Sequence, residues 1–188
     1  EASVRAVIAG ADAVVNCTGI LFETGKNSFD AVQADGAGRV AALAAEAGVA
    51  NLVHISAIGA DAGSDSDYAR TKGEGEAAVL AAFPSAVILR PSIIFGTEDG
   101  FFNRFAGMVR FSPILPITGG QSRLQPVYVD DVAHAAANAA QGSVAAGVYE
   151  LGGPDTDTFR GLMQTMLTEI RRKRVIFDMP GFMARATA

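Results

Sequence analysis

Short apolar runs alternate with Ala-rich segments along this chain, and this alternation constrains the fold more than any other feature. The runs Asn51–Ala57 (NLVHISA) and Ala86–Arg90 (AVILR) are typical of buried strands. Between them, Tyr68–Phe83 has helical character and is stopped by Pro84. A succession of strand, helix and strand makes a βαβ unit. The sequence therefore predicts an α/β fold with a doubly wound parallel sheet.

Further segments extend the same pattern. The other expected strands are Ala11–Asn16, Gln125–Val129, Gly147–Leu151 and Val175–Phe177. The other expected helices are Ser3–Gly10, Ser28–Ala47, Asp130–Ala140 and Phe159–Arg172. We expect Ser3 and Asp130 to act as N-caps, and Gly48 to end the helix before it.

The length of 188 residues, with 49% apolar and 19% charged residues, suits a single domain with one core, so we expect residues 1–188 to form one domain. Two irregular segments, 98–123 and 154–188, are expected to form a small lobe at the carboxyl edge of the sheet. Within the second, Pro180–Ala188 begins an amphipathic pattern. Because the first residues form a helix that feeds directly into a strand, we expect the chain to open within a crossover. It would then be truncated at the N-terminus and lack the first βαβ unit.

Charge and cysteine content exclude several classes of function. Fifteen basic against twenty acidic residues give a net charge of -5, which argues against a nucleic-acid partner. The single cysteine, Cys17, rules out an internal disulfide and indicates a reducing compartment. With only His54 and His134 as histidines, we expect no metal site. No stretch approaches the roughly 20 apolar residues of a membrane span, so none is expected.

The strongest candidate for chemistry is the pair Tyr68 and Lys72. On a helix, positions i and i+4 share a face, so the phenol and the ammonium can point into one cleft. The lysine charge is expected to lower the pKa of the phenol toward a value useful for proton transfer to a carbonyl oxygen. The ammonium can also bind a ribose diol. The alternative interpretation of this spacing is an ordinary helix surface without a function, on which Tyr and Lys meet by chance.

The order of several motifs resembles that of an extended or atypical short-chain dehydrogenase/reductase, in the superfamily of NAD-dependent epimerases and dehydratases. These motifs are NCTG, ISAIGAD, YARTK, RPSIIFG and QPVYVDDVA, and they span nearly the whole chain. More narrowly, residues 68–106 resemble the family of NADPH-binding accessory subunits of respiratory complex I and their alphaproteobacterial relatives. The resemblance implies a Rossmann-like fold.

The same resemblance implies a set of cofactor-binding residues. They are Thr18, Gly19, Tyr68, Lys72, Pro91, Ser92 and Ile93. Thr18 and Gly19 would face the adenine ribose, Tyr68 and Lys72 the nicotinamide ribose, and residues 91–93 the nicotinamide. All follow the carboxyl ends of strands, where open α/β sheets bind ligands. The resemblance favours NADP(H) over NAD(H).

Two features depart from the family pattern. The Gly-rich pyrophosphate loop has no counterpart, and Gly36–Ala41 (GAGRVA), which fits GxGxxA, follows a helical segment. We therefore interpret Gly36 and Gly38 as helix positions that allow close approach to the sheet. In addition, Ala57 occupies the position of the usual catalytic Ser or Thr. Because strand residues alternate, Ser56 is expected to face away from Tyr68, unless the strand has already ended there. Whether the chain is an enzyme stays open.

The remaining candidates have structural interpretations. Cys17 and His54 are expected in the core, His134 in solvent, and Asp130 and Asp131 at a helix start. An aromatic cluster is expected in the core of the small lobe, with a substrate pocket or a docking surface as the alternatives. It consists of Phe95, Phe101, Phe102, Phe105 and Phe111.

Two functions follow from the resemblance. The first is an NAD(P)(H)-binding accessory subunit of NADH:ubiquinone oxidoreductase (complex I), with complex I subunits as partners and a mainly structural cofactor. The second is an active NAD(P)-dependent reductase or epimerase of the short-chain dehydrogenase type, in which Tyr68 and Lys72 act on a small-molecule substrate. The expected location is cytoplasmic, or peripheral on the cytoplasmic side of the bacterial inner membrane, or the matrix side in a mitochondrion.

Overall fold

The computed structural model describes residues 1–179, and the chain divides into two compact units. The first unit consists of Glu1–Pro91 and Asp130–Leu151, and the second of Ser92–Val129 and the residues from Gly152 onward. The predicted amphipathic pattern of Pro180–Ala188, at the end of the expected small lobe, lies outside the described residues. The expectation of one domain with a small lobe stays a prediction.

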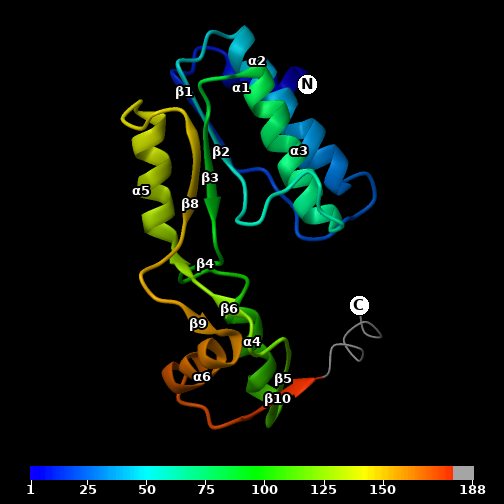
Figure 1. Cartoon of the computed structure of the whole chain (residues 1–188), viewed down its shortest axis with the longest axis vertical. Helices are drawn as coiled ribbons and strands as arrows, with labels where there is room; N and C mark the ends of the chain where they lie inside the picture. Colours follow the sequence, from blue (N-terminus) through cyan, green and yellow to red (C-terminus); the bar gives the residue numbers. More distant parts are fainter. Residues whose placement is uncertain (180–188) are drawn as a thin grey trace. The chain divides into compact units, whose positions relative to one another are not determined.

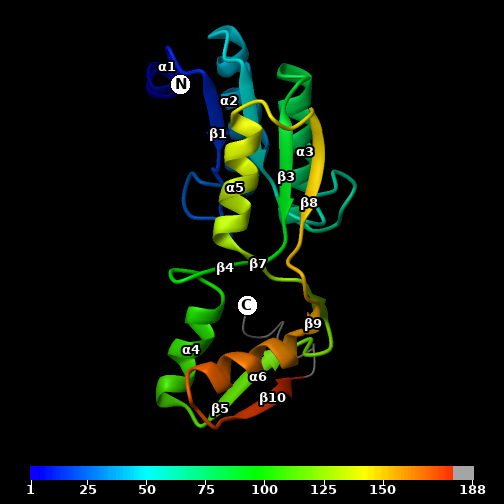
Figure 2. The ribbon, with the colours of Figure 1, turned by 90° about the vertical axis from the view of Figure 1, so that its left-hand side faces the viewer.

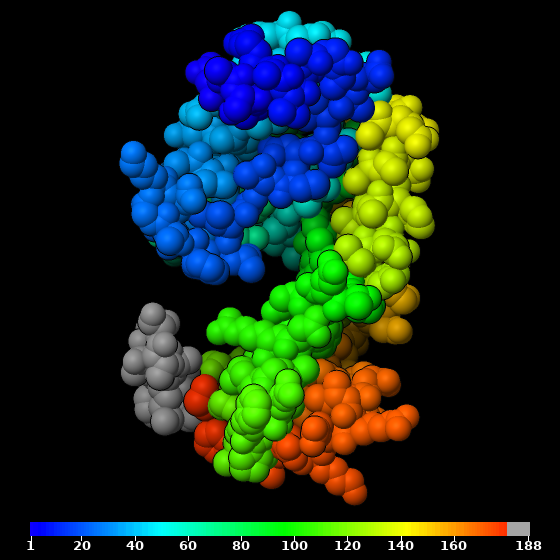
Figure 3. Space-filling model, turned by 180° about the vertical axis from the view of Figure 1, so that it is seen from behind, coloured from blue at the N-terminus to red at the C-terminus, as the bar shows by residue number. Residues whose placement is uncertain are grey.

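A four-stranded sheet forms the centre of the first unit, and all of its neighbouring strands are parallel (Figure 1). The strands, in spatial order, are β1 (Ala13–Asn16), β2 (Asn51–Ile55), β3 (Val87–Pro91) and β8 (Gly147–Leu151). The predicted α/β fold with a parallel sheet is confirmed. β1 is an edge strand, and the N-terminal residues, in dark blue, are uncovered on the face that Figure 3 shows.

Helices cover both faces of this sheet. One face carries α1 (Ala2–Ile8), the π-helix η1 (Asp30–Asp35), α2 (Gly36–Glu46) and α3 (Asp67–Ala82), and the other carries α5 (Val129–Ala140) (Figure 2). The core divides accordingly, because successive strand residues point to opposite faces. Leu52 packs with Val79 and Phe83, whereas Val53 packs with Ala139.

The second unit has its own apolar core. Its strands form three pairs: parallel β4 (Ile94–Phe95) with β7 (Val127–Tyr128), parallel β5 (Ile114–Thr118) with β10 (Val175–Met179), and antiparallel β6 (Arg123–Leu124) with β9 (Asp157–Thr158). The helices α4 (Phe102–Phe111) and α6 (Phe159–Glu169) pack against the β5–β10 pair. Their shared core contains Val109, Leu115, Met163 and Leu167.

The aromatic cluster divides between core and surface. Phe101, Phe102 and Phe105 pack against the core of the second unit, where Phe101 and Phe105 also contact the ring of Phe159. Phe111 is 87% exposed, so its predicted place in the core is wrong. It lies at the last position of α4, and its ring is covered only in part, by the guanidinium of Arg110 at 5.4 Å.

Several local predictions need correction. Ser3 lies inside α1, and the cap position is Glu1. α5 begins at Val129, so Asp130 and Asp131 occupy its first turn instead of the cap, where they still face the positive end of the helix dipole. Cys17 is exposed, because it follows the end of the edge strand β1. His54 is buried and His134 exposed, as predicted.

The glycines of GAGRVA serve a helix contact. A Cβ on Gly38 would lie 2.9 Å from the Cβ of Ala78, so α2 and α3 approach each other closely at this point. The expected close approach therefore exists, but it is made to α3 and not to the sheet. Gly75 allows a second close approach, between α3 and η1, because a Cβ there would collide with the backbone carbonyl oxygen of Gln33.

A buried carboxylate ties α3 to the sheet. Glu76, only 5% exposed, accepts a short hydrogen bond from the Ser56 hydroxyl. It also forms a two-pronged ion pair with Arg90 of β3, with Nε to Oε1 at 2.9 Å and Nη2 to Oε2 at 2.6 Å. The hydrogen-bonded pair with Glu76 raises the pKa of the Arg90 guanidinium, and this effect outweighs the lowering of the pKa by partial burial. Glu76 thereby fixes the rotation of α3 about its own axis.

We predict that Gly75→Ala destabilises the protein by about 1–3 kcal/mol, although alanine is the better helix former by about 1 kcal/mol. The added methyl group meets backbone, which cannot rotate away as a side chain can. The matched control is Gly107→Ala in α4, where a Cβ meets nothing within 4 Å and the substitution should be neutral or stabilising. Urea unfolding of both variants measures the difference. Equal stabilisation by both would contradict the close approach at Gly75.

We also predict that Glu76→Ala destabilises the fold by about 2–4 kcal/mol, because the partly buried Arg90 guanidinium keeps only its long, exposed contact with Glu150 at 3.8 Å and the Ser56 hydroxyl loses its acceptor. Glu74→Ala is the control, since Glu74 makes a more exposed i,i+4 pair with Arg70 on the same helix. Its loss should cost less than about 1 kcal/mol in the same urea titration. Similar losses for both variants would show that the Glu76 network does not hold α3.

Candidate functional site

The turn that follows β1 is held by Asn16. Its Oδ1 accepts a hydrogen bond from the backbone N–H of Thr18 at 3.1 Å. Its Nδ2 lies 3.2 Å from Nδ1 of His54, the residue opposite it in the β1–β2 register. Asn16 thus links the end of β1, the turn with Thr18 and Gly19, and the interior of β2.

His54 is held in its neutral form. It is 1% exposed, and burial, together with the positive charge of Lys72, lowers its pKa to about 4 against the weaker opposing effect of Glu76. Because Oδ1 of Asn16 accepts from Thr18, Nδ2 must donate to Nδ1 of His54, and we assign the ring hydrogen to Nε2. This buried Nε2 has no hydrogen-bond partner among residues 1–179.

Lys72 is brought to the same turn. Its Nζ donates to the carbonyl oxygen of Ile55 at 3.3 Å, and the residue is 5% exposed. Burial lowers the pKa of this ammonium, and the nearby Glu76 opposes the change. A Cβ on Gly19 would lie 3.3 Å from Nζ, so the missing side chain leaves space at the ammonium. The structure therefore joins the predicted residues Gly19 and Lys72 in one place.

Tyr68 lies one turn before Lys72 and is half-buried. Its ring meets that of Phe29 edge to face, with centroids 5.9 Å apart. The expected lowering of the phenol pKa by Lys72 is wrong for this arrangement, because burial dominates and raises the pKa of Tyr68. The phenol is therefore held as a neutral donor.

The hydroxyl of Ser56 is turned to Glu76 and not to Tyr68. The regular strand ends at Ile55, but the backbone N–H groups of Ser56 and Ile58 still bond Leu89 and Pro91 of β3, so the alternation of side chains continues. Ala57 has no hydroxyl to offer. Neither position supplies Tyr68 with the partner that a working reductase would use.

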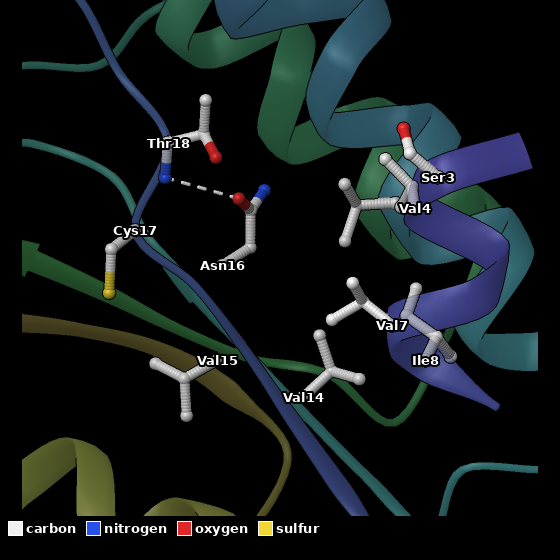
Figure 4. Close-up of a pocket in the computed structure, with 10 residues that line it drawn as sticks. Ser3, Val4, Val7, Ile8, Val14, Val15, Asn16, Cys17 and Thr18 are labelled. Carbon is white, nitrogen blue, oxygen red and sulfur yellow. Dashed lines mark hydrogen bonds between the residues drawn. The ribbon is translucent and has the colours of Figure 1, made fainter. Parts of the chain in front are cut away.

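The other predicted residues are divided between the units. Pro91 ends β3 in the first unit, opposite Leu151 of β8. Ser92 and Ile93 belong to the second unit, where the carbonyl oxygen of Ile93 accepts from the N–H of Val127 at 2.9 Å. Thr18 is exposed at the rim of a cavity of about 310 Å³ whose walls are mostly apolar side chains of α1 and β1 (Figure 4).

Sequence reasoning missed Asn16 and Glu76. Both carried a signal, since a polar residue at the end of a buried strand needs a partner, and Glu76 stands four residues after Lys72 on the same helical face. In the described part of the chain, no group of three or more His, Cys, Asp or Glu side chains is arranged to hold a metal ion. No helix there is long and apolar enough to span a membrane.

The chain is similar to subunits of a respiratory enzyme. It is 39% identical over 192 residues to the mitochondrial NADH dehydrogenase (ubiquinone) 1 alpha subcomplex subunit 9 of Arabidopsis thaliana, covering 100% of this chain and 48% of that protein. The NADH-ubiquinone oxidoreductase 40 kDa subunit of Neurospora crassa is 31% identical, with 95% and 47% covered. A ceramide reductase of Caulobacter vibrioides is 37% identical over 124 residues, with 66% and 39% covered. The chain spans about half the length of the curated relatives it matches, or less.

Solved structures share the fold at low sequence identity. The dTDP-4-dehydrorhamnose reductase of Bacillus anthracis in complex with NADP superposes with a TM-score of 0.82 at 16% identity, covering 97% of this chain and 72% of that one. The UDP-glucuronic acid 4-epimerase of Bacillus cereus in complex with NAD gives 0.76 at 18% identity, with 93% and 66% covered. The Rossmann-like architecture predicted from the motif order is thereby confirmed.

A family profile identifies the chain more directly. The RmlD substrate binding domain family matches residues 60–178, which include α3 with Tyr68 and Lys72, β3 and most of the described second unit. This match covers more than half of the sequence. The protein therefore belongs to the RmlD substrate binding domain family.

Proposed function

We propose that this protein binds a nicotinamide dinucleotide and serves as an accessory subunit of a respiratory NADH:ubiquinone oxidoreductase. The observation that carries the proposal is the meeting of the turn after β1 with the buried ammonium of Lys72. The names of the relatives from Arabidopsis thaliana and Neurospora crassa support the assignment to the respiratory enzyme. Complex I subunits are then the partners, and the protein is peripheral, on the matrix or cytoplasmic side of the membrane.

The residues present fit such a cofactor. Gly19 leaves open the space that a Cβ would take beside Nζ of Lys72, so a ribose hydroxyl can reach the ammonium. Thr18 lies exposed on the same turn, and Tyr68 offers a neutral phenol one helical turn away. Pro91, Ser92 and Ile93 complete the proposed set. NADP(H) is proposed over NAD(H) on the family resemblance alone, since the solved structures of the same fold hold NADP in one case and NAD in the other.

The geometry favours binding over turnover. Reduction of a carbonyl needs donors that stabilise the developing negative charge on its oxygen, and loss of one such donor costs about 10²–10³ in rate. The hydroxyl of Ser56 is committed to Glu76, and Ala57 has none. A cofactor held without turnover still stabilises the folded state by mass action.

An active NAD(P)-dependent reductase or epimerase is the second candidate. The intact pair Tyr68 and Lys72, catalytic residues in this case, and the similarity to the Caulobacter vibrioides ceramide reductase favour it. The substrate would be a small molecule, and Tyr68 would donate its proton to the reacting oxygen. The two candidates differ in what they require of Tyr68.

We predict that Lys72→Ala in the full-length protein weakens NADPH binding at least tenfold and abolishes the rise in thermal unfolding midpoint that NADPH produces. The ammonium contacts the ribose in every bound state, whereas the phenol acts only when chemistry occurs. Tyr68→Phe should therefore change NADPH affinity less than threefold. Isothermal titration with NADPH and NADH checks both variants, and Lys26→Ala, in an exposed loop, is the matched control.

Two results would contradict parts of this proposal. Unchanged NADPH affinity in Lys72→Ala would remove the dinucleotide site from α3. Robust carbonyl reduction by the wild type, abolished by Tyr68→Phe, would establish the reductase instead of the accessory subunit. Co-purification of the tagged protein with complex I subunits tests the partner separately.

The site should also make stability depend on pH. His54 has a folded-state pKa of about 4, below its ordinary value of 6.5, so the unfolded chain binds more protons between these limits. The contribution of His54 to the free energy of unfolding is therefore complete above pH 6.5. It is lost as the pH drops toward 4, which lowers stability by up to roughly 3 kcal/mol. Urea titrations between pH 4 and 7 should show a shallower slope for His54→Asn, while the exposed His134→Asn keeps the wild-type slope. Identical slopes in all three proteins would refute the neutral assignment of His54.

A further inference from the structure

The second unit contains a cavity of about 620 Å³ that the proposed dinucleotide site leaves unused. More than half of the described residues that line it come from α4 and from α6 with its C-cap, and the rest from β4, β9 and neighbouring loops. This volume lies within the range of about 300–1,000 Å³ that is usual for small-molecule sites. None of the described lining residues belongs to the proposed dinucleotide site, so this inference is independent of the proposed function.

Most of the cavity wall is apolar. Phe95 and Phe102 meet edge to face at 6.2 Å, and Leu162, Met166 and Ile170 extend the wall along α6 and its C-cap. Covering this wall with an apolar group removes its surface from water, which is favourable. The cavity therefore suits a hydrocarbon chain or ring.

The charge at the cavity has one sign. The described lining residues include four carboxylates, Asp99, Asp155, Asp157 and Glu169, and no Lys, Arg or His. Asp99 accepts from the N–H of Phe102, and Asp157 from that of Thr158. The carboxylates of Asp155 and Glu169 accept no hydrogen bond from residues 1–179. They also form no ion pair there, because all ion pairs among these residues lie in the first unit.

This combination selects among ligand classes. A diphosphate or carboxylate ligand would meet like charge without a compensating cation. A metal ion is disfavoured because no group of three or more ligating side chains is assembled in residues 1–179. An organic cation with an apolar body satisfies both the wall and the two carboxylates without a partner.

We propose that this cavity binds a small amphiphile that carries a protonated amine. Its hydrocarbon part lies against Phe95, Phe102 and Leu162, and its ammonium lies at Asp155 and Glu169. A basic amphipathic peptide has similar chemistry at larger size, and the variants below distinguish it from a ligand that enters the cavity.

The test uses three ligands of equal chain length, namely octylamine, 1-octanol and sodium octanoate, titrated calorimetrically into the full chain. We expect octylamine to bind tightest, octanol more weakly and octanoate weakest. Raising the salt concentration should weaken octylamine and leave octanol unchanged, because only the amine depends on charge. Octanoate binding as tight as octylamine would overturn the proposal.

Substitutions locate the binding. Asp155→Asn and Glu169→Gln should each weaken octylamine about fivefold and leave octanol unchanged. Both side chains are exposed, so neither change disturbs the fold. Glu98→Gln, the same loss of charge at an exposed residue that does not line the cavity, should have no effect. Equal octylamine affinity in the double variant and the wild type would overturn the proposal.

Filling the cavity gives an independent readout. Leu162→Trp should abolish binding of octylamine and octanol alike, with the unfolding midpoint measured to confirm a folded variant. If Leu162→Trp folds and still binds octylamine as the wild type does, the ligand lies outside the cavity, as a surface-bound peptide would, and the proposal fails. NADPH titrations are run separately, so failure of the dinucleotide site leaves this ranking of ligands unaffected.

Discussion

The ion pair between Glu76 and Arg90 is the interaction on which the candidate site depends most. It joins a buried carboxylate of α3 to the guanidinium of β3 and engages the hydroxyl of Ser56 at the end of β2. One turn before Glu76 stands Lys72, and one turn before that Tyr68. Because a helix is rigid over two turns, fixing Glu76 also fixes the direction in which the ammonium and the phenol point.

The same interaction supports the proposal of binding over turnover. Ser56 is the hydroxyl nearest in sequence to the usual catalytic position, and it serves the network that holds α3. A side chain that stabilises a buried carboxylate is not free to stabilise a reacting oxygen. Ser56 cannot serve both purposes at once, and in this structure its hydroxyl bonds Glu76.

Much of the fold could be predicted because it follows from local patterns. The runs NLVHISA and AVILR predicted the bounds of β2 and β3 to within two residues. Tyr68 and Lys72 lie on α3, where a helix was predicted. The exposure of Cys17 and Phe111 could not be predicted, because it depends on what lies beside an edge strand and past the end of α4. The neutral state of Tyr68 escaped prediction for a similar reason, since burial is a property of the assembled molecule.

The pairing of Asn16 with His54 and the role of Glu76 required the register between strands and helix. Sequence spacing places two residues on one face of a helix, but it does not say which strand residue lies beneath them. The approaches of Gly38 to Ala78 and of Gly75 to Gln33 in η1 belong to the same class, because both arise from helix packing. The prediction that GAGRVA is not a phosphate loop nevertheless came from local evidence, the helical segment before it.

The division of the chain has a consequence for its synthesis. The polypeptide passes from one unit to the other three times, after Pro91, Val129 and Leu151. As the chain emerges from the ribosome, the first sheet cannot gain its edge strand β8 until Ser92–Val129 has been made, and the second core then still lacks α6. Neither unit can finish before the other has begun, so unfinished apolar surfaces of both coexist on the nascent chain. Misassembly between domains is a characteristic failure of multidomain chains, and two unfinished apolar surfaces on one nascent chain expose this fold to it.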